Sequence, residues 1–264
     1  MVKKINYDIA NIENCIVMDT KIGKKYDAKK KKAAYKKVRA RLKKRRDIVD
    51  YLTAENLNSL PGPGIFEKVG YLPPEIIVLD ERIKEMCTLP FWQEFALDGT
   101  RVKKYGKCPG YGVHFSCPPH PPKRLIKDQE DLNKSNAFFL LESGPQSVNT
   151  LAGGAAPWQA EFLWELKRQM DRQFGKGTLI QTYAAGPCQA CHPNMCVTVK
   201  GKCLEPKKKT RSLEAVGMPC AVMCDDMALL SGDESWKIKY IQHWGLPNQT
   251  PKTYKLLWGA ALKI

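Results

Sequence analysis

Residues 157–183 read PWQAEFLWELKRQMDRQFGKGTLIQTY and set the architecture of the chain. Apolar side chains recur there every four residues, which predicts an amphipathic helix that begins after Pro157 and ends at Gly175. The apolar positions are Trp158, Phe162, Leu166, Met170 and Phe174. Residues 178–183 follow with a pattern that predicts a strand.

Upstream of this helix, the apolar run at residues 138–142 predicts a buried strand. Strand, helix and strand form a unit whose two strands we expect to pair in parallel, which would bring the cysteine groups on either side of it together. Further elements are predicted as strands at 75–79, 237–243 and 253–264 and as short helices at 80–86 and 90–96. The expected class is α/β, a mixed sheet flanked by helices with cysteine-rich metal-binding loops.

The chain is 264 residues long and carries 43 Lys and Arg against 27 Asp and Glu, a net charge of +16. The excess lies near the start, because the first fifty residues hold 17 Lys and Arg against 6 Asp and Glu. Residues 27–52 are mostly strong helix formers, with Asp27 as a candidate N-cap. Ala34, Val38 and Leu42 form a thin apolar stripe along them. We therefore expect a long N-terminal basic helix.

This charge distribution divides the chain into a basic helical arm, residues 1–56, and a cysteine-rich α/β metal-binding domain, residues 57–264. The prolines and glycines of residues 53–75 predict a loop-rich link between them. The arm is compatible with a solvated surface helix, with a docking face for an acidic partner protein, and with a nucleic-acid contact. No stacking pattern of aromatic residues accompanies the basic run, which disfavours nucleic acid.

Apolar runs such as residues 137–141 are far shorter than the roughly 20 residues that span a bilayer, so no membrane span is expected. The first residues lack the apolar core of a secretory signal, which predicts a cytoplasmic protein. Ten cysteines in that reducing compartment need an explanation other than disulfides. Eight of them lie between Cys108 and Cys224, in groups separated by Gly and Pro, which indicates metal ligation.

The densest cysteine group is Cys188-x2-Cys191-x4-Cys196-x6-Cys203, within GPCQACHPNMCVTVKGKC. Four thiolates this close along the chain can surround one metal centre, and thiolates favour iron–sulfur clusters and zinc. Structural zinc sites usually pair two CxxC knuckles, whereas one CxxC with single staggered cysteines is closer to a cluster-binding loop. The spacing therefore favours a [4Fe–4S] cluster, with zinc as the alternative.

A second, looser group combines Cys108 and Cys117 with Cys220 and Cys224. These cysteines form a second four-thiolate site if the two segments meet in the fold. The alternative is that Cys220 and Cys224, one helical turn apart, are small buried apolar residues. A further alternative makes Cys117 an exchangeable ligand or a reactive thiol near the first cluster.

Other polar groups lie beside the cysteines. Three histidines are candidate ligands or proton donors, although surface hydrogen bonding is the commoner use of this side chain: His114, His120 and His192. Residues 207–209 and Arg211 are basic, and they would offset the negative charge of a four-thiolate cluster or receive an anionic substrate or an acidic electron donor. The chain has no Walker loop, no GxGxxG after a strand, no HExxH and no GxSxG, so no nucleotide cofactor is predicted.

Three stretches together resemble the "predicted metal-binding protein" family, which comprises cysteine-rich proteins of bacteria and archaea, many of them anaerobes. They are YGKCPGYGVHFSCPPHPP, the cysteine run that ends at Cys203, and RSLEAVGM at residues 211–218. The resemblance spans roughly residues 100–225 and leaves out the basic arm. It implies metal or iron–sulfur binding and no reaction, with ligands at Cys108, Cys117, Cys188, Cys191, Cys196 and Cys203.

The chain departs from the family pattern in two places. The spacing from Cys191 to Cys196 is wider than the CxxCxxC expected there. Cys220 and Cys224 lie where the family usually has no cysteine, and this surplus is what makes a second cluster conceivable.

Three functions fit these features. The first is an iron–sulfur redox protein that passes single electrons to, or activates, a larger anaerobic enzyme system and docks an acidic redox partner through the basic helix. The second is a reductase or related enzyme that uses one or two [4Fe–4S] clusters at its active site. The third is a zinc-stabilised nucleic-acid-binding protein whose Lys-rich arm contacts phosphates. We expect the first, and the sequence leaves open whether the protein is an enzyme.

Overall fold

The computed structural model of the chain describes residues 27–85, 91–95, 101–105, 111–112, 117, 125–144, 146–147, 158–186, 188–191, 196, 203–237, 253–254 and 256–264. Its helices are α2 (Ala28–Lys44), α3 (Arg46–Tyr51), α4 (Ala54–Asn58), α5 (Glu81–Glu85), α6 (Leu125–Lys134), α8 (Trp158–Phe174) and α9 (Cys220–Ser231). Short 3₁₀ turns are η1 (Pro74–Ile76), η4 (Glu214–Val216) and η5 (Glu234–Trp236). The strands are β1 (Phe66–Leu72), β2 (Phe91–Phe95), β3 (Arg101–Tyr105), β4 (Ala137–Ser143), β5 (Gln146–Ser147), β6 (Leu179–Tyr183), β7 (Thr253–Tyr254) and β8 (Leu257–Leu262).

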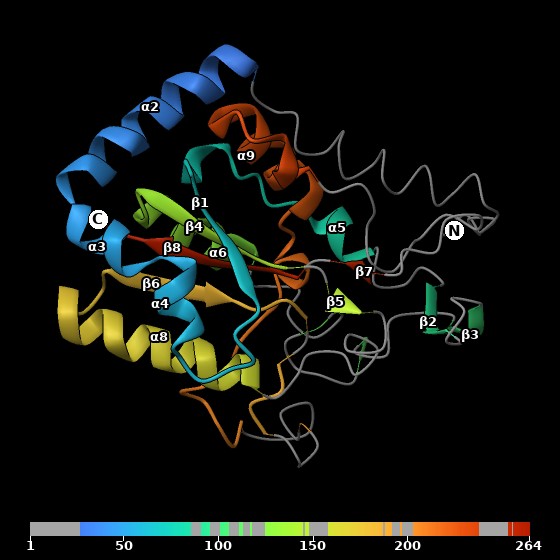
Figure 1. The fold of residues 1–264 in the computed structure, drawn as a ribbon. Helices are drawn as coiled ribbons and strands as arrows, with labels where there is room; N and C mark the ends of the chain where they lie inside the picture. Colours follow the sequence, from blue (N-terminus) through green and yellow to red (C-terminus); the bar gives the residue numbers. More distant parts are fainter. Residues whose placement is uncertain are drawn as a thin grey trace.

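A four-stranded antiparallel sheet in the order β1-β4-β8-β6 lies at the centre of the described structure (Figure 1). Every residue of β4 and of β8 is buried, as expected for inner strands that are covered on both faces. Successive side chains of β4 enter different cores: Phe139 and Leu141 belong to the first core, and Phe138 and Leu140 belong to the second core. The sheet therefore separates two apolar layers.

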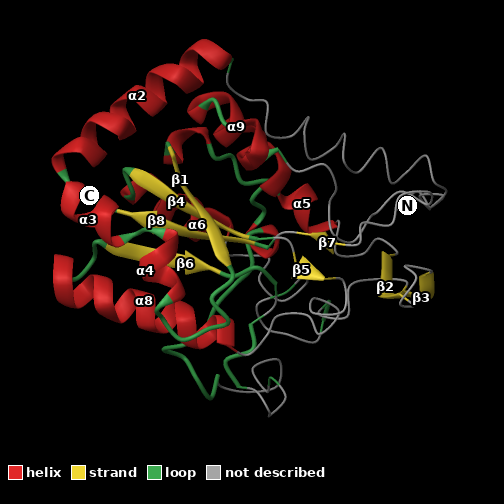
Figure 2. Cartoon of the chain, in the orientation of Figure 1, coloured by secondary structure: helices red, strands yellow, loops and turns green. Residues whose placement is uncertain are grey.

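Helices cover both faces of this sheet (Figure 2). One layer packs α3, α4 and α8 against the strands, and the other packs α6, α9 and the turns η1 and η4. The predicted α/β class is confirmed. The cysteines at 188, 191, 196 and 203 lie in loops, as predicted.

The basic helix α2 lies along the β1 edge of the sheet, where it contacts β1, η1 and α9 (Figure 1). The predicted stripe faces inward: Val38 is fully buried, Leu42 packs on one core and Ala34 on the other. Asp27 is the N-cap, because its side chain accepts a hydrogen bond of 2.8 Å from the backbone N–H of Lys30. Residues of α3 and α4 belong to the first core, together with Val38 of α2.

Several predicted elements need correction. The helix expected over residues 27–52 is interrupted at Arg45, whose φ of −117° and ψ of 52° are not helical. Residues 53–75 are more than a loop, because they contain α4 and the edge strand β1 on either side of the PGPG loop. Neither has a strong sequence pattern, because α4 has Leu57 as its one buried residue and β1 is a short run between Pro63 and Pro73.

In two short segments the secondary structure differs from the one expected from the sequence. Residues 75–79 form the turn η1 and an unpaired buried segment, not a strand, because their apolar side chains fill the second core without a neighbouring strand. Residues 91–95 form β2, which pairs with β3, where a helix over 90–96 was expected. The aromatic residues of this segment favour strand.

The strand, helix and strand unit is present, but its strands are not adjacent. Both β4 and β6 pair antiparallel with β8, so they are parallel to each other with β8 between them. Strands in the tail (β7 and β8) and the helix predicted at 80–86 (α5) are confirmed. Of the strand predicted at 237–243, all residues after Lys237 lie outside the described part of the chain. None of the described helices has both the length and the apolar character needed to cross a bilayer.

Candidate metal centre

The four cysteines of the dense group lie in one loop, which is closed at its base. The loop leaves the end of β6 at Ala184, which forms an isolated parallel bridge with Ser212. At this bridge the backbone N–H of Ala184 donates to the carbonyl of Arg211 at 2.7 Å. All four thiols therefore belong to a segment whose two ends are fixed side by side. We call residues 185–211 the cysteine loop.

Side-chain contacts attach the cysteine loop to the first turn of α8, which the orange trace passes in Figure 1. Lys208 Nζ lies 2.5 Å from Glu161 Oε2, and this hydrogen bond raises the pKa of Lys208. The backbone N–H of Ala185 donates to Gln159 Oε1 at 3.1 Å. Trp258 of the central strand donates to the same oxygen through its indole N–H at 2.8 Å, so the loop is connected to the sheet.

The thiols interact with backbone donors and with one another. The backbone N–H of Thr210 donates to Cys188 Sγ at 3.4 Å. Burial raises the pKa of the Cys191 thiol, and the negative charges of Cys203, Cys196 and Cys188 raise it further, whereas a hydrogen bond from the backbone of Glu205 lowers it. Because charge interactions of this kind act over short distances, Cys188, Cys196 and Cys203 lie near enough to Cys191 to affect its charge.

The donor set fits a soft metal, since it consists of four thiols with backbone N–H groups directed at two of them. All four cysteines are half-buried, and no disulfide joins any of the cysteines that the structure describes. Within the described ranges, no three His, Cys, Asp or Glu side chains are close enough to hold an ion. Ligation by the four thiols therefore requires the loop to tighten around the metal.

Positive charge follows the fourth cysteine. Lys207 is exposed, Lys208 pairs with Glu161, and Arg211 is buried beside the base of the loop. This distribution places cations on the side of the loop that returns to the sheet. Such charges would lessen the net negative charge of a four-thiolate centre.

The second group of cysteines is described only in part. Cys117 is buried, and Cys220 and Cys224 lie one turn apart at the start of α9, which is the arrangement that the alternative for these two cysteines assumed. Cys224 is fully buried in the second core, and Cys220 Sγ donates to Glu214 Oε1 at 3.4 Å. Cys108 lies outside the described residues, as do the three candidate histidines, His114, His120 and His192.

The segment RSLEAVGM forms the turn that follows the cysteine loop. It contains Ser212 of the bridge and the 3₁₀ turn η4, whose C-cap is Gly217 with a φ of +83°. The carbonyl of Gly217 accepts a hydrogen bond of 2.9 Å from the backbone N–H of Asp80, just before α5. The motif thus fixes the far end of the cysteine loop to the rest of the fold.

Sequence reasoning did not find Gln159 and Glu161, the α8 residues that hold the loop. Only the apolar positions of that helix carried a signal, and a polar residue on a helix has no pattern that marks it as an anchor. Thr210 was missed for a similar reason, because its backbone N–H, and not its side chain, contacts Cys188.

No curated protein and no solved structure shows significant similarity to the chain. A family-level comparison matches residues 98–231 to a family described as "predicted metal-binding protein", DUF2284. This match confirms the resemblance seen in the sequence, and it extends over the whole cysteine loop and α9. It is a family of unknown function and names no metal. The chain belongs to this family of predicted metal-binding proteins.

Proposed function

We propose that Cys188, Cys191, Cys196 and Cys203 bind a [4Fe–4S] cluster and that the protein transfers single electrons to a larger anaerobic enzyme system or activates it. The observation that carries the proposal is the closed cysteine loop, in which three thiols raise the pKa of the fourth, Cys191, and backbone N–H groups are directed at sulfur. When bound, such a cluster supplies one-electron oxidation and reduction.

The chain's own residues have separate tasks in this proposal. The four thiolates bind the metal, and the backbone N–H groups of Thr210 and Glu205 stabilise the negative charge on sulfur. Gln159 and Glu161 of α8 orient the loop through their contacts with Ala185 and Lys208. Fixed anchors of this kind reduce the entropy that the loop loses when it closes on a metal.

The wider setting is part of the same proposal. We place the protein in the cytoplasm, where reducing conditions keep thiols available for metal. The basic N-terminal helix would dock an acidic redox protein or a larger enzyme complex, because oppositely charged surfaces speed the encounter of electron-transfer partners.

The test is the metal and sulfide content of protein purified without oxygen. A [4Fe–4S] protein is expected to contain about four irons and about four acid-labile sulfides per chain and to give a paramagnetic signal after reduction. Replacing Cys188, Cys191, Cys196 or Cys203 by Ala should remove most of the iron. One zinc per chain without sulfide would overturn the proposal.

Two matched variants define the extent of the site. Cys220→Ala and Cys224→Ala change cysteines outside the cysteine loop and should leave the iron content unchanged. About eight irons in the wild type, with loss of half in these two variants, would instead establish a second cluster. That result would favour the reductase hypothesis over simple electron transfer.

A further inference from the structure

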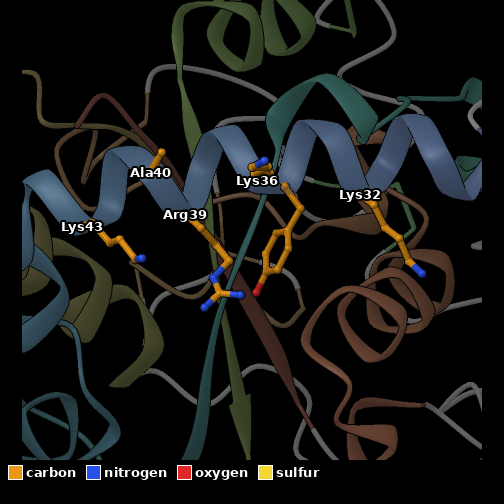
Figure 3. Close-up of a pocket in the computed structure, with 6 residues that line it drawn as sticks. Lys32, Lys36, Arg39, Ala40 and Lys43 are labelled. Carbon is orange, nitrogen blue, oxygen red and sulfur yellow. The ribbon is translucent and has the colours of Figure 1, made fainter.

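A row of cations lines one face of α2. Lys32, Lys36, Arg39 and Lys43 surround a surface recess of about 390 Å³, together with Tyr35 and Ala40. The four cations are spaced by three or four residues, which places them on one side of the helix over a length of about 16 Å at 1.5 Å per residue. Figure 3 shows Lys32, Arg39 and Lys43 projecting on the same side. We call this feature the α2 recess.

The α2 recess combines an apolar floor with a charged rim. Lysine side chains present aliphatic stems along the helix and keep their ammonium groups in water. The ring of Tyr35 is half-buried between them, and its burial raises the pKa of its hydroxyl. A ligand that fits must therefore offer one apolar group to the floor and negative charges to the rim.

The charge of this face is not balanced within the described part of the chain. The sequence of α2 contains no acidic residue. The ion pair described for this helix uses Lys31, which faces inward, whereas Lys32, Lys36 and Lys43 are exposed and form no described ion pair. The cations of the recess are thus available to carboxylates or phosphates from another molecule.

The helix that carries the recess is held rigidly. Lys31 Nζ lies 2.5 Å from Asp226 Oδ1 of α9, and both side chains are buried. Val38 is fully buried, and Arg41 donates to the carbonyl of Asn136 at 3.0 Å. A partner therefore meets cations on a fixed backbone, which lowers the entropy cost of binding.

We propose that the α2 recess binds an acidic amphipathic helix of a partner protein, with carboxylates on the cationic rim and one apolar side chain beside Tyr35. A nucleic-acid backbone would use the cations but leave the apolar floor unfilled, and α2 offers a single aromatic ring for stacking. This inference specifies the kind of acidic partner that the proposed function requires, and it rests on the docking role proposed there for the basic N-terminal helix. It does not depend on the metal in the cysteine loop.

The probe is a synthetic helical peptide that carries four Glu at the spacing of the rim cations and one central Leu. Its binding to the protein is measured by fluorescence anisotropy at physiological salt. The recess variant Lys32→Gln/Lys36→Gln/Lys43→Gln should weaken binding by at least about tenfold. The matched control is Lys30→Gln/Lys37→Gln/Lys44→Gln, which removes three exposed lysines from another face of the same helix. The control should weaken binding by less than about threefold, because it lowers only the general attraction.

Tyr35→Ala tests the apolar floor separately from the charges. It should weaken binding of the Leu peptide and leave binding of an otherwise identical Ala peptide unchanged. All variants change side chains that are at least partly exposed, and circular dichroism and thermal unfolding verify that each remains folded.

Three results would overturn the proposal. Equal losses in the recess variant and in its matched control would mean that only net charge matters. Tighter binding of a thymidine oligonucleotide or a DNA duplex than of the Glu peptide, with the same dependence on Lys32, Lys36 and Lys43, would identify a nucleic-acid surface. Absence of peptide binding by the wild type would also refute it. The iron content is measured in the same samples, because it reports on the cluster proposal alone. Lost peptide binding with unchanged iron content is therefore a failure of the α2 recess proposal and not of the cluster proposal.

Discussion

Gly217 shows why the segment RSLEAVGM can be essential without touching a metal. Its φ of +83° lies in the left-handed region, and a Cβ at this position would lie 2.6 Å from the carbonyl oxygen of Asp80. The backbone N–H of Asp80 donates to the carbonyl of Gly217 in return. Only glycine allows the two backbones to approach this closely. The glycine thus holds the turn that ends the cysteine loop.

Gly217→Ala should therefore destabilise the fold by more than backbone conformation alone requires. A left-handed residue other than glycine costs about 1–3 kcal/mol by itself, so we expect a larger loss than this in the free energy of unfolding, measured with urea. The matched control is Gly232→Ala, because Gly232 has a φ of +78° but no atom within 4 Å of its Cβ position. Equal losses in the two variants would show that contact with Asp80 is unimportant.

The four cysteines of the candidate site could be singled out from the sequence because they are local. Four thiols within one short loop form a pattern that needs no tertiary information. The supports for that loop could not be predicted, since Gln159 and Glu161 reach it across the fold and Thr210 acts through its backbone. Cys220 and Cys224 illustrate the limit, because only the structure shows that Cys224 lies in the core.

The ion pair between Lys31 and Asp226 joins two helices that are far apart in sequence. Burial raises the pKa of Asp226 above its ordinary value, and this effect outweighs the hydrogen bond from Lys31, which lowers it. Loss of the lysine would leave a buried carboxylate without a partner. The pair therefore holds α2 in place only while both members are present.

Lys31→Met should lower the free energy of unfolding by about 3–5 kcal/mol, measured with urea at pH 8. The loss should be smaller at pH 5, because removing Lys31 takes away the interactions that lower the pKa of Asp226, so burial raises this pKa further and the carboxyl of the variant takes up a proton more readily as pH falls. Lys32→Met, at the exposed neighbouring position, should change stability by no more than about 0.5 kcal/mol.

The double variant Lys31→Met/Asp226→Met provides the second arm of this test. It removes both charges and should regain most of the lost stability, because apolar residues can replace a buried pair without a large cost. A double variant as unstable as Lys31→Met would show that the single variant fails for reasons of packing and not of charge.

A second contact between helices links α3 to α8, and it depends on the ionisation of Glu165. Glu165 accepts hydrogen bonds of 2.7 Å from two nitrogens of Arg168 and one of 2.9 Å from Gln169, and these lower its pKa to about 2. The hydroxyl of Tyr51 in α3 donates to Gln169 Oε1 at 2.5 Å. The carboxylate thus supports the side chain that connects the two helices.

Because its pKa is lowered from 4.5 to about 2, ionised Glu165 contributes stability above about pH 4.5, and this contribution is lost as pH falls toward 2. Glu165→Gln should lower the urea midpoint at pH 7 and have little effect at pH 2.5. Arg168 is 48% exposed, so the change should stay within about 1 kcal/mol. Glu130→Gln, an exposed position in α6, serves as the control, and an equal pH dependence there would contradict the assignment.

The elements that could be predicted are those with a long or fully apolar pattern, such as α2, α8 and β4. The missed strands β1 and β2 are short and lie between prolines or polar residues, so their sequences resemble loop or helix as much as strand. The position of β8 between β4 and β6 could not be predicted either. It depends on pairing with β4 across more than a hundred residues and with β6 across more than seventy, which local patterns do not record.

In the described part of the chain, the four cysteines of the cysteine loop lie outside both cores, and only Ala185 at the base of the loop packs against the first core. Both cores combine the sheet with helices, and none of Cys188, Cys191, Cys196 and Cys203 belongs to either of them in the described structure. The loop is joined to the cores at its base and by its contacts with α8. The fold therefore has a source of stability that is independent of any metal, unlike a small zinc finger.

We therefore expect metal-free protein to stay folded. A variant with Ser at all four cysteines of the loop should keep the far-UV circular dichroism spectrum and the cooperative urea unfolding of the metal-free wild type. Metal should add stability only to the wild type, by an amount that grows with free metal concentration, because it binds the folded loop and not the variant. If the variant and the metal-free protein were both unfolded, the metal would be structural, and the independence of the two cores from the cysteine loop would be wrong.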